Sequence, residues 1–231
     1  MNFAPNISSH RILYHFPLSP QSRAVRLTLI EKNLPFELLI EKPWERRDPF
    51  LKLSPTGDVP ILLEANGFSI NDAMAACEYL NETNTDHDLL GETAETRAEV
   101  RRICHWFFTK FTLEVSQYLI GEKIYKRFSR QGSPQSEFIR AGKTNLGYHL
   151  DYISFLNSRR HWLASDFLSL ADLVAAAHIS VIDYLVDINW APYPEAQEWY
   201  AKIKSRPSFK PLLQDSVPGL PPAPHYTELD F

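Results

Sequence analysis

The chain has 231 residues, of which 44% are hydrophobic and 13% aromatic, so it can bury one large core or two smaller ones. Its 24 basic and 28 acidic residues give a net charge of −4 without a dominant basic stripe, which argues against nucleic acid as a partner. No apolar run reaches the roughly 18 residues of a membrane span, and residues 1–10 lack a signal-peptide pattern. We therefore expect a cytoplasmic protein without membrane insertion, in which Cys77 and Cys104 are reduced.

The first third of the chain alternates short apolar runs with one stretch of helical spacing. The runs are bounded by proline, glycine and asparagine, which are typical of turns between strands. Residues 42–53 fit no period and are expected to form a loop, with room for a short helical turn. The expected order is strand, helix, strand, strand, strand, helix, over residues 12–16, 22–32, 36–40, 57–63, 67–71 and 72–81. This is the order of a thioredoxin-like half-domain.

From residue 93 onward, apolar residues recur at helical spacing over long stretches, which predicts helices over residues 93–128, 133–157, 173–185 and 195–206. Ser169 and Asp172 form a capping-box pattern before the third of these helices. That helix is apolar almost all round, so we expect it to be central and buried. We divide the chain into a thioredoxin-like domain (1–83), a linker (84–92), an all-helical domain (93–209) and an extended proline-rich tail (210–231).

Three short motifs in the first third resemble one known family. Ser19-Pro20-x-Ser22-Arg23 follows the first strand, Val59-Pro60 opens the third strand, and Asp72-Ala73 starts the next helix. With the last long helix, they resemble the glutathione S-transferase superfamily over almost the whole chain. The resemblance implies an α/β plus all-α fold: a thioredoxin-like N-terminal domain with a mixed four-stranded sheet, followed by the all-helical C-terminal domain of that superfamily.

The resemblance also implies the remnant of a glutathione site. Ser19 is in the position whose side chain contacts the glutathione sulfur, because amides and a positive dipole at a helix N-terminus stabilise a thiolate. An equally weighted alternative is that Ser19 or Ser22 only caps the helix. Val59, before Pro60, is in the position that offers its backbone to the cysteinyl part of glutathione, and this proline is cis in the superfamily.

The start of the next helix argues against catalysis. In active members, an acidic or amide residue takes the γ-glutamyl ammonium and a serine hydroxyl takes its carboxylate. These positions hold Asp72 and Ala73, and Ala73 has no hydroxyl. One lost hydrogen bond to a charged group costs about 1.5–3 kcal/mol. We therefore favour no catalytic residue and no cofactor, unless the protein is an active transferase that uses Ser19 with glutathione. The histidines show no metal-ligand spacing, so no metal site is expected.

Two stretches combine aromatic residues with arginines, the composition of interface hot spots. Trp44 precedes a pair of arginines, and Arg127 and Arg130 lie close to Tyr125 and Phe128. We predict Trp44, Arg127 and Arg130 as partner-binding residues. The alternative for Trp44 is packing against the edge of the sheet.

The tail carries four prolines in residues 218–224 and ends in aromatic and acidic residues. Its predicted contact residues are Tyr226, Glu228, Asp230 and Phe231. It could dock in a groove of its own helical domain or on another protein, and we favour a second partner because clustered negative charges beside aromatics suit recognition better than burial. The tail and residues 43–46 resemble a narrower group, glutathione-transferase-like bacterial division proteins that bind the tubulin homologue FtsZ.

That narrower resemblance implies a dimer that has given up glutathione and that bends or bundles FtsZ filaments at the division site. Two function hypotheses follow. The first is a non-catalytic adaptor that binds FtsZ and regulates cell division, with a tail for a second division partner. The second is a cytosolic glutathione S-transferase that uses Ser19. A homodimer is also expected, because the helices at residues 72–81 and 93–128 carry more apolar residues than one core face needs.

Overall fold

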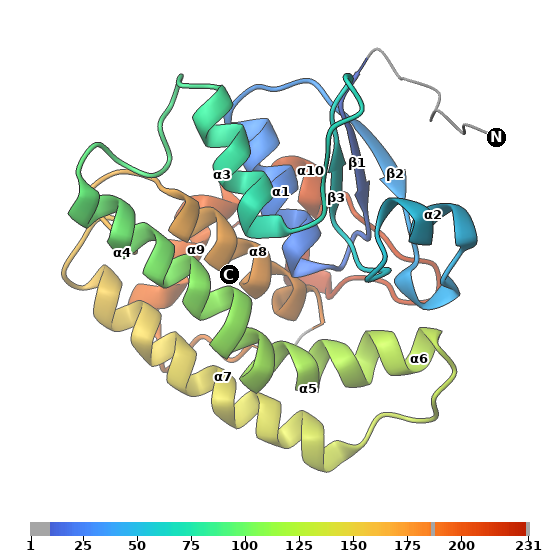
Figure 1. Ribbon diagram of the computed structural model, residues 1–231. Helices are drawn as coiled ribbons and strands as arrows, with labels where there is room; N and C mark the ends of the chain where they lie inside the picture. Colours follow the sequence, from blue (N-terminus) through green and yellow to red (C-terminus); the bar gives the residue numbers. More distant parts are fainter. Residues whose placement is uncertain (1–9, 186–187, 230–231) are drawn as a thin grey trace.

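The computed structural model describes residues 10–185 and 188–229 and has two packed parts, a sheet with its helices and a bundle of helices (Figure 1). The predicted fold class is confirmed, with a thioredoxin-like first part followed by an all-helical second part. The first part consists of β1 (Ile12–His15), α1 (Pro20–Glu31), β2 (Glu37–Ile40), the short 3-10 helix η1 (Pro43–Glu45), α2 (Asp48–Leu53), β3 (Ile61–Leu63), β4 (Ser69–Ile70) and α3 (Ala73–Thr83).

The sheet is mixed and has the strand order β2-β1-β3-β4. β1 pairs with β2 in parallel, with Leu13 opposite Leu38, and with β3 antiparallel, with Leu13 opposite Leu62. Leu13 and Leu62 are fully buried, because both faces of the central strands are covered. Residues 42–53, which fit no sequence period, form η1 and α2, each with a proline in its first turn.

The second part begins with one long rod of helix that changes its winding along its length. Its segments η2 and η3 have wide turns, in which an N–H bonds to the carbonyl five residues back, a geometry found in π-helices. The elements of the rod are α4 (Ala94–His105), η2 (Trp106–Ser116), α5 (Gln117–Ile120), η3 (Gly121–Tyr125) and α6 (Lys126–Phe128). They are followed by α7 (Ser136–Asn157), α8 (Leu170–Tyr184), α9 (Pro194–Lys204), α10 (Lys210–Leu213) and the 3-10 turn η4 (Pro224–Thr227).

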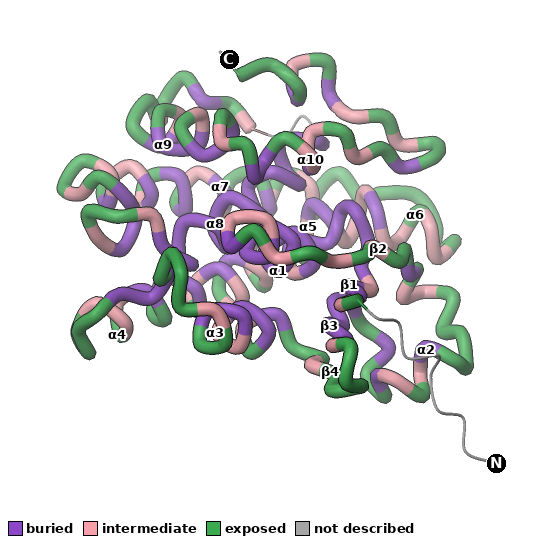
Figure 2. The backbone as a smooth tube through the Cα atoms, turned by 90° about the horizontal axis from the view of Figure 1, so that it is seen from above, coloured by how far each residue is buried: buried purple, intermediate pink, exposed green. Residues whose placement is uncertain are grey.

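Helix α8 is the centre of the molecule, as predicted. All of its residues are buried, and Figure 2 shows it surrounded by the other helices. The capping box is present: the Ser169 backbone N–H donates to Asp172 Oδ2 at 3.0 Å. The same carboxylate accepts from Trp199 Nε1 on α9 at 3.0 Å. The box therefore both starts α8 and joins α9 to it.

The C-terminal segment corrects the sequence-based interpretation. Residues 210–213 form α10, and the segment beyond it packs back against the chain's own helices instead of standing away from them. The Tyr184 hydroxyl donates to the Leu220 carbonyl at 2.5 Å, and the Ala223 N–H donates to the Tyr184 carbonyl at 3.1 Å. Tyr226 is fully buried. Burial of the large Tyr226 ring favours this packing, while Glu228 stays exposed to water.

Candidate functional site

A cleft of about 920 Å³ lies between the sheet part and the helical rod. Gln21, Asp58, Val59, Pro60, Asp72 and Ala73 line it on the sheet side, and Arg101, His105, Phe108, Thr112 and Tyr125 line it on the helical side. We refer to this hollow as the cleft. Four of the residues predicted from the sequence, Val59, Pro60, Asp72 and Ala73, lie in it together.

The Val59–Pro60 peptide bond is cis, as the resemblance implied. Within the described residues, neither the N–H nor the C=O of Val59 has a hydrogen-bond partner. An unpaired donor and acceptor side by side at a cleft wall can pair with an extended ligand, as one strand pairs with another.

Ser19 does not face the cleft. Its side chain is almost fully buried, and its Oγ accepts a hydrogen bond from the Ser22 N–H at 3.2 Å. Ser19 therefore caps α1, which was the alternative to a sulfur contact. Gln21, two residues further on, lines the cleft instead. The sequence analysis missed Gln21, although its place in the first turn of α1 beside the motif was the available signal.

Asp72 and Ala73 lie at the start of α3. Asp72 Oδ1 accepts from the Ala75 N–H at 2.8 Å, so this carboxylate caps the helix. Ala73 is the first residue of the helix, and its methyl side chain cannot donate a hydrogen bond. The cleft can thus bind a ligand through backbone atoms and Asp72, but it offers no hydroxyl at Ala73.

Asp58 and Tyr125 are cleft residues that the sequence analysis did not assign to the site. Burial, together with the smaller effect of the nearby Asp58 carboxylate, raises the pKa of Tyr125 to about 12. Tyr125 is therefore a neutral hydrogen-bond donor at physiological pH. On the opposite wall, Arg101 Nε bonds to Glu78 Oε1 at 2.6 Å, so these two charges neutralise each other.

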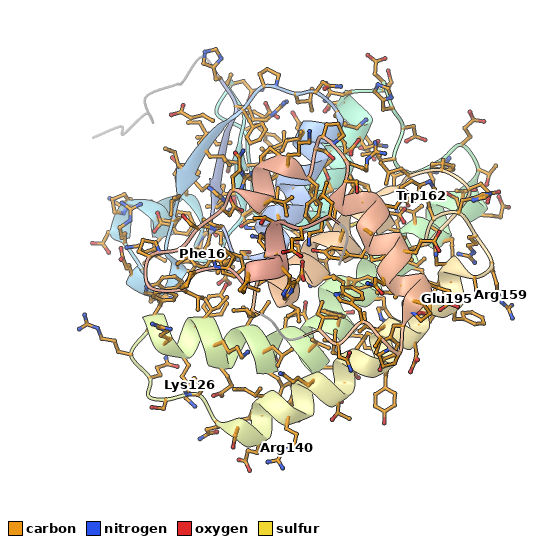
Figure 3. The ribbon with its side chains drawn as sticks, turned by 180° about the vertical axis from the view of Figure 1, so that it is seen from behind. Phe16, Lys126, Arg140, Arg159, Trp162 and Glu195 are labelled. Atoms are coloured by element: carbon orange, nitrogen blue, oxygen red, sulfur yellow. The ribbon has the colours of Figure 1, made fainter. Side chains whose placement is uncertain are left out.

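Trp44 is half-buried in a cluster of aromatic rings, and its assignment as a partner-binding residue stays a prediction. Its ring stacks on Phe128 with 5.4 Å between centroids, meets the edge of Phe16 at 5.0 Å and lies 6.1 Å from Tyr125. Phe16 lies at the joint of the two parts (Figure 3). Trp44 therefore joins the sheet part to α6. From the sequence, the alternative to partner binding was packing against the edge of the sheet alone.

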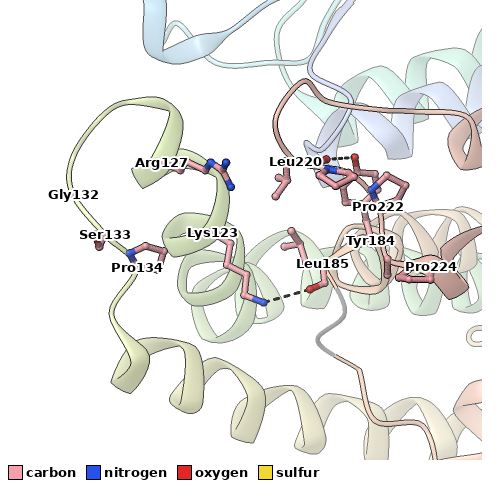
Figure 4. A pocket seen from close by; sticks show the side chains of 12 residues that line it. Lys123, Arg127, Gly132, Ser133, Pro134, Tyr184, Leu185, Leu220, Pro222 and Pro224 are labelled. Carbon is pink, nitrogen blue, oxygen red and sulfur yellow. Dashed lines mark hydrogen bonds between the residues drawn. The ribbon is translucent and has the colours of Figure 1, made fainter.

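Arg127 lies beside a second hollow of about 570 Å³, which we call the basic groove (Figure 4). Lys123, Arg127, Ser133 and Pro134 form one side, and the segment 220–224 forms the other, with Tyr184 and Leu185 also lining it. Lys123 Nζ donates to the Leu185 carbonyl at 3.4 Å. Arg127 and Arg130 are both exposed, and neither has an ion-pair partner within the part of the chain that the structure describes.

Two buried polar clusters hold the C-terminal segment in place. In the first, the fully buried Arg23 donates to Ser180 Oγ at 2.7 Å, to the Tyr226 hydroxyl at 2.9 Å and to Asp215 Oδ2 at 3.3 Å. Arg26 donates to Asp215 Oδ1 at 2.7 Å. Asp215 therefore neutralises two arginines of α1, and Tyr226 is part of this cluster.

In the second cluster, the buried Asp183 carboxylate accepts from Lys204 Nζ and from the Tyr200 hydroxyl, both at 3.1 Å. His225 Nε2 lies 3.1 Å from the other oxygen. Tyr226 is thus wrong as a partner contact in this conformation, whereas Glu228 is exposed. Asp230 and Phe231 lie outside the described residues.

The described residues hold no group of three or more side chains arranged to bind a metal ion. Both cysteines are buried, and burial raises the pKa of Cys77 to about 12, so this thiol stays protonated. Within the same residues, no helix is both long and apolar enough to cross a membrane.

Comparison with known proteins identifies the family. The model of the glutathione S-transferase N-terminal domain matches residues 18–83. The chain is 46% identical to FtsZ-localized protein A of Caulobacter vibrioides over 228 residues, which cover 97% of this chain and 100% of that protein. The chain belongs to the FtsZ-localized protein A family of the glutathione S-transferase superfamily.

Solved structures agree with this membership. FzlA from C. crescentus superposes with a TM-score of 0.94 at 46% identity, covering 96% of this chain and 100% of that one. A glutathione S-transferase from Rhodospirillum rubrum superposes with a TM-score of 0.93 at 50% identity, with the same coverage of both chains. The chain thus shares its fold with both structures over 96% of its length.

Proposed function

We propose that the protein is a non-catalytic adaptor that binds FtsZ filaments in the cytoplasm, at the division site, and regulates bacterial cell division. The observation that carries the proposal is the 46% identity to FtsZ-localized protein A over nearly the whole chain. The site supports it, because Ser19 is buried as a helix cap and Ala73 has no hydroxyl for a glutathione carboxylate.

The family resemblance implies that FtsZ filaments are acidic overall, and the surface that suits such a filament is the basic groove with the exposed Arg127 and Arg130. These two arginines have no anionic partner among residues 10–185 and 188–229, so they can pair with carboxylates of another protein. Such charges chiefly increase the association rate and set specificity. Trp44 contributes indirectly in this proposal. Its stacking on Phe128 holds the end of α6, the helix that carries Arg127.

Arg127→Asp is expected to weaken co-sedimentation with purified FtsZ filaments by at least about tenfold, because the change reverses a charge at a predicted hot spot. Helical content should stay the same, since Arg127 is exposed. The matched control is Arg140→Asp on the exposed face of α7, which should co-sediment as wild type. Equal co-sedimentation of both variants would place the FtsZ surface elsewhere.

Retention of the purified protein on a glutathione matrix distinguishes the adaptor from the alternative, a glutathione S-transferase that uses Ser19. The adaptor should pass through a glutathione matrix without retention. Tight retention, abolished by Ser19→Ala without loss of folding, would favour the transferase.

A homodimer is part of the proposal, and its expected interface is the face of α3 and α4 beside β4. Phe68 is 52% exposed there and lies 5.6 Å from the Tyr79 ring. Light scattering should give twice the chain mass of 26.7 kDa, and Phe68→Glu should shift the mass toward the monomer. Phe155→Glu on α7 is the control, because Phe155 is similarly exposed at 49%. A wild-type monomer at micromolar concentration would contradict the expectation.

The end of the C-terminal segment is proposed to bind a second division partner through Glu228 and the residues after it, Asp230 and Phe231. Because Tyr226 anchors the segment, Glu228→Lys should leave the melting temperature and FtsZ co-sedimentation unchanged and should impair division in cells that depend on the variant. Glu195→Lys, an exposed charge reversal on α9, should support normal division. Normal division with Glu228→Lys would remove this partner from the proposal.

A further inference from the structure

The charges that line the cleft do not cancel. Asp58, Asp72 and Glu78 are its carboxylates, and Arg101 and His105 are its basic groups. Arg101 pairs with Glu78. Asp58 is exposed and has no ion-pair partner within the described ranges, and Asp72 bonds only to a backbone N–H. Two carboxylates of the cleft thus remain without a cationic partner in the part of the chain that the structure describes.

Asp58 lies directly beside the backbone atoms that a ligand would use. It precedes Val59, whose N–H and C=O are unpaired, and consecutive Cα atoms are about 3.8 Å apart. A peptide that paired with Val59 in an extended conformation would therefore pass within about 4–8 Å of the Asp58 carboxylate. The neighbouring Tyr125 hydroxyl is neutral and supplies no compensating charge.

We infer that the cleft selects extended, peptide-like ligands that carry a lysine- or arginine-type cation and excludes anionic ones, and that Asp58 is the specificity-determining residue. A unit charge about 6 Å from a carboxylate in a partly hydrated cleft changes affinity by about tenfold or more. Glutathione binding would then be weakened for two physical reasons, the missing donor at Ala73 and repulsion of its carboxylates by Asp58. The inference concerns the cleft alone and does not depend on FtsZ binding.

The test compares two reduced tripeptides of nearly equal size: glutathione, which is anionic, and its bis-amide, in which both carboxylates are carboxamides and the ammonium remains. Titration calorimetry on the full chain at low salt should show the bis-amide binding at least about tenfold more tightly. At roughly 0.5 M salt, this preference should shrink because the Debye length falls to a few ångströms.

Asp58→Asn should reduce the preference for the bis-amide several-fold, whereas Asp166→Asn, an exposed change outside the cleft, should leave it unchanged. Three results would overturn the inference: glutathione binding as tightly as its bis-amide, a preference unaffected by Asp58→Asn, or no binding of either compound at about 10 mM. Asp58→Asn should still co-sediment with FtsZ, so failure of this inference is distinguishable from failure of the adaptor proposal.

Discussion

Asp215→Ala is expected to lower the free energy of unfolding by about 3–5 kcal/mol, because it leaves two largely buried guanidinium groups without their anion. Asp215 is the carboxylate that pairs with both Arg23 and Arg26. Arg23 is 1% exposed, so water cannot replace the lost partner. Urea denaturation of wild type and variant at neutral pH measures the difference.

Two comparisons make this result specific. Asp166→Ala, an exposed change, should stay within about 0.5 kcal/mol of wild type. The double variant Arg23→Met, Asp215→Ala should regain part of the loss, since one of the two unpaired charges is removed. A loss below about 1 kcal/mol for Asp215→Ala alone would mean that the cluster does not stabilise the fold.

Acid is expected to destabilise the fold strongly between pH 6.5 and pH 4, through histidines that are buried in the neutral form. Burial lowers the pKa of His178 from 6.5 to about 3, and burial also lowers the pKa of His15 to about 4. Below pH 6.5, the unfolded chain binds protons that the folded chain cannot bind. The contribution of these histidines to the free energy of unfolding is therefore fully present above pH 6.5. It is lost as the pH falls toward their pKa values in the folded chain.

His178 allows a direct measurement of this effect. Both of its ring nitrogens lack hydrogen-bond partners among the described residues, and it packs against the rings of Phe107, Phe108 and Phe111. pH 4.5 is two pH units below the pKa of histidine in the unfolded chain. At this pH, His178 accounts for about 2.7 kcal/mol of the decrease in the free energy of unfolding. His178→Leu should reduce the difference in unfolding free energy between pH 7.5 and pH 4.5 by about that amount.

The exposed His161 provides the control, because His161→Leu should leave the pH dependence unchanged. If His178→Leu has the same pH dependence as wild type, His178 is not the group that links acid to unfolding.

Features set by neighbouring residues could be predicted from the sequence. The capping box at Ser169 and Asp172 lies within four residues, and the all-apolar pattern of the following helix indicated its central position. The family resemblance predicted the cis peptide bond at Val59–Pro60. Ser19 was ambiguous, because a serine at a helix N-terminus satisfies both the capping and the sulfur-contact pattern.

Features set by distant residues could not be predicted in this way. Trp44 stacks on Phe128. Tyr226 packs against the ring of Tyr184 and accepts a hydrogen bond from Arg23. Nothing next to Trp44 or Tyr226 in the sequence distinguishes an exposed aromatic residue from a buried one. The uncompensated charge of the cleft likewise depends on which carboxylates happen to have a cation nearby in space.

The cluster at Arg23 has a consequence for synthesis of the chain. The Tyr226 hydroxyl that bonds to Arg23 belongs to a residue 203 positions later. At about 5–20 residues per second, a ribosome needs roughly 10–40 s to add that stretch. Until Asp215 and Tyr226 have been made, the Arg23 guanidinium can bond to the nearby Pro17 carbonyl but lacks its anion and the Tyr226 hydroxyl, so this buried cluster stays incomplete during most of synthesis. A chain truncated before Asp215 should therefore leave the charges of Arg23 and Arg26 unpaired and be more sensitive to proteases than the chain that contains Asp215.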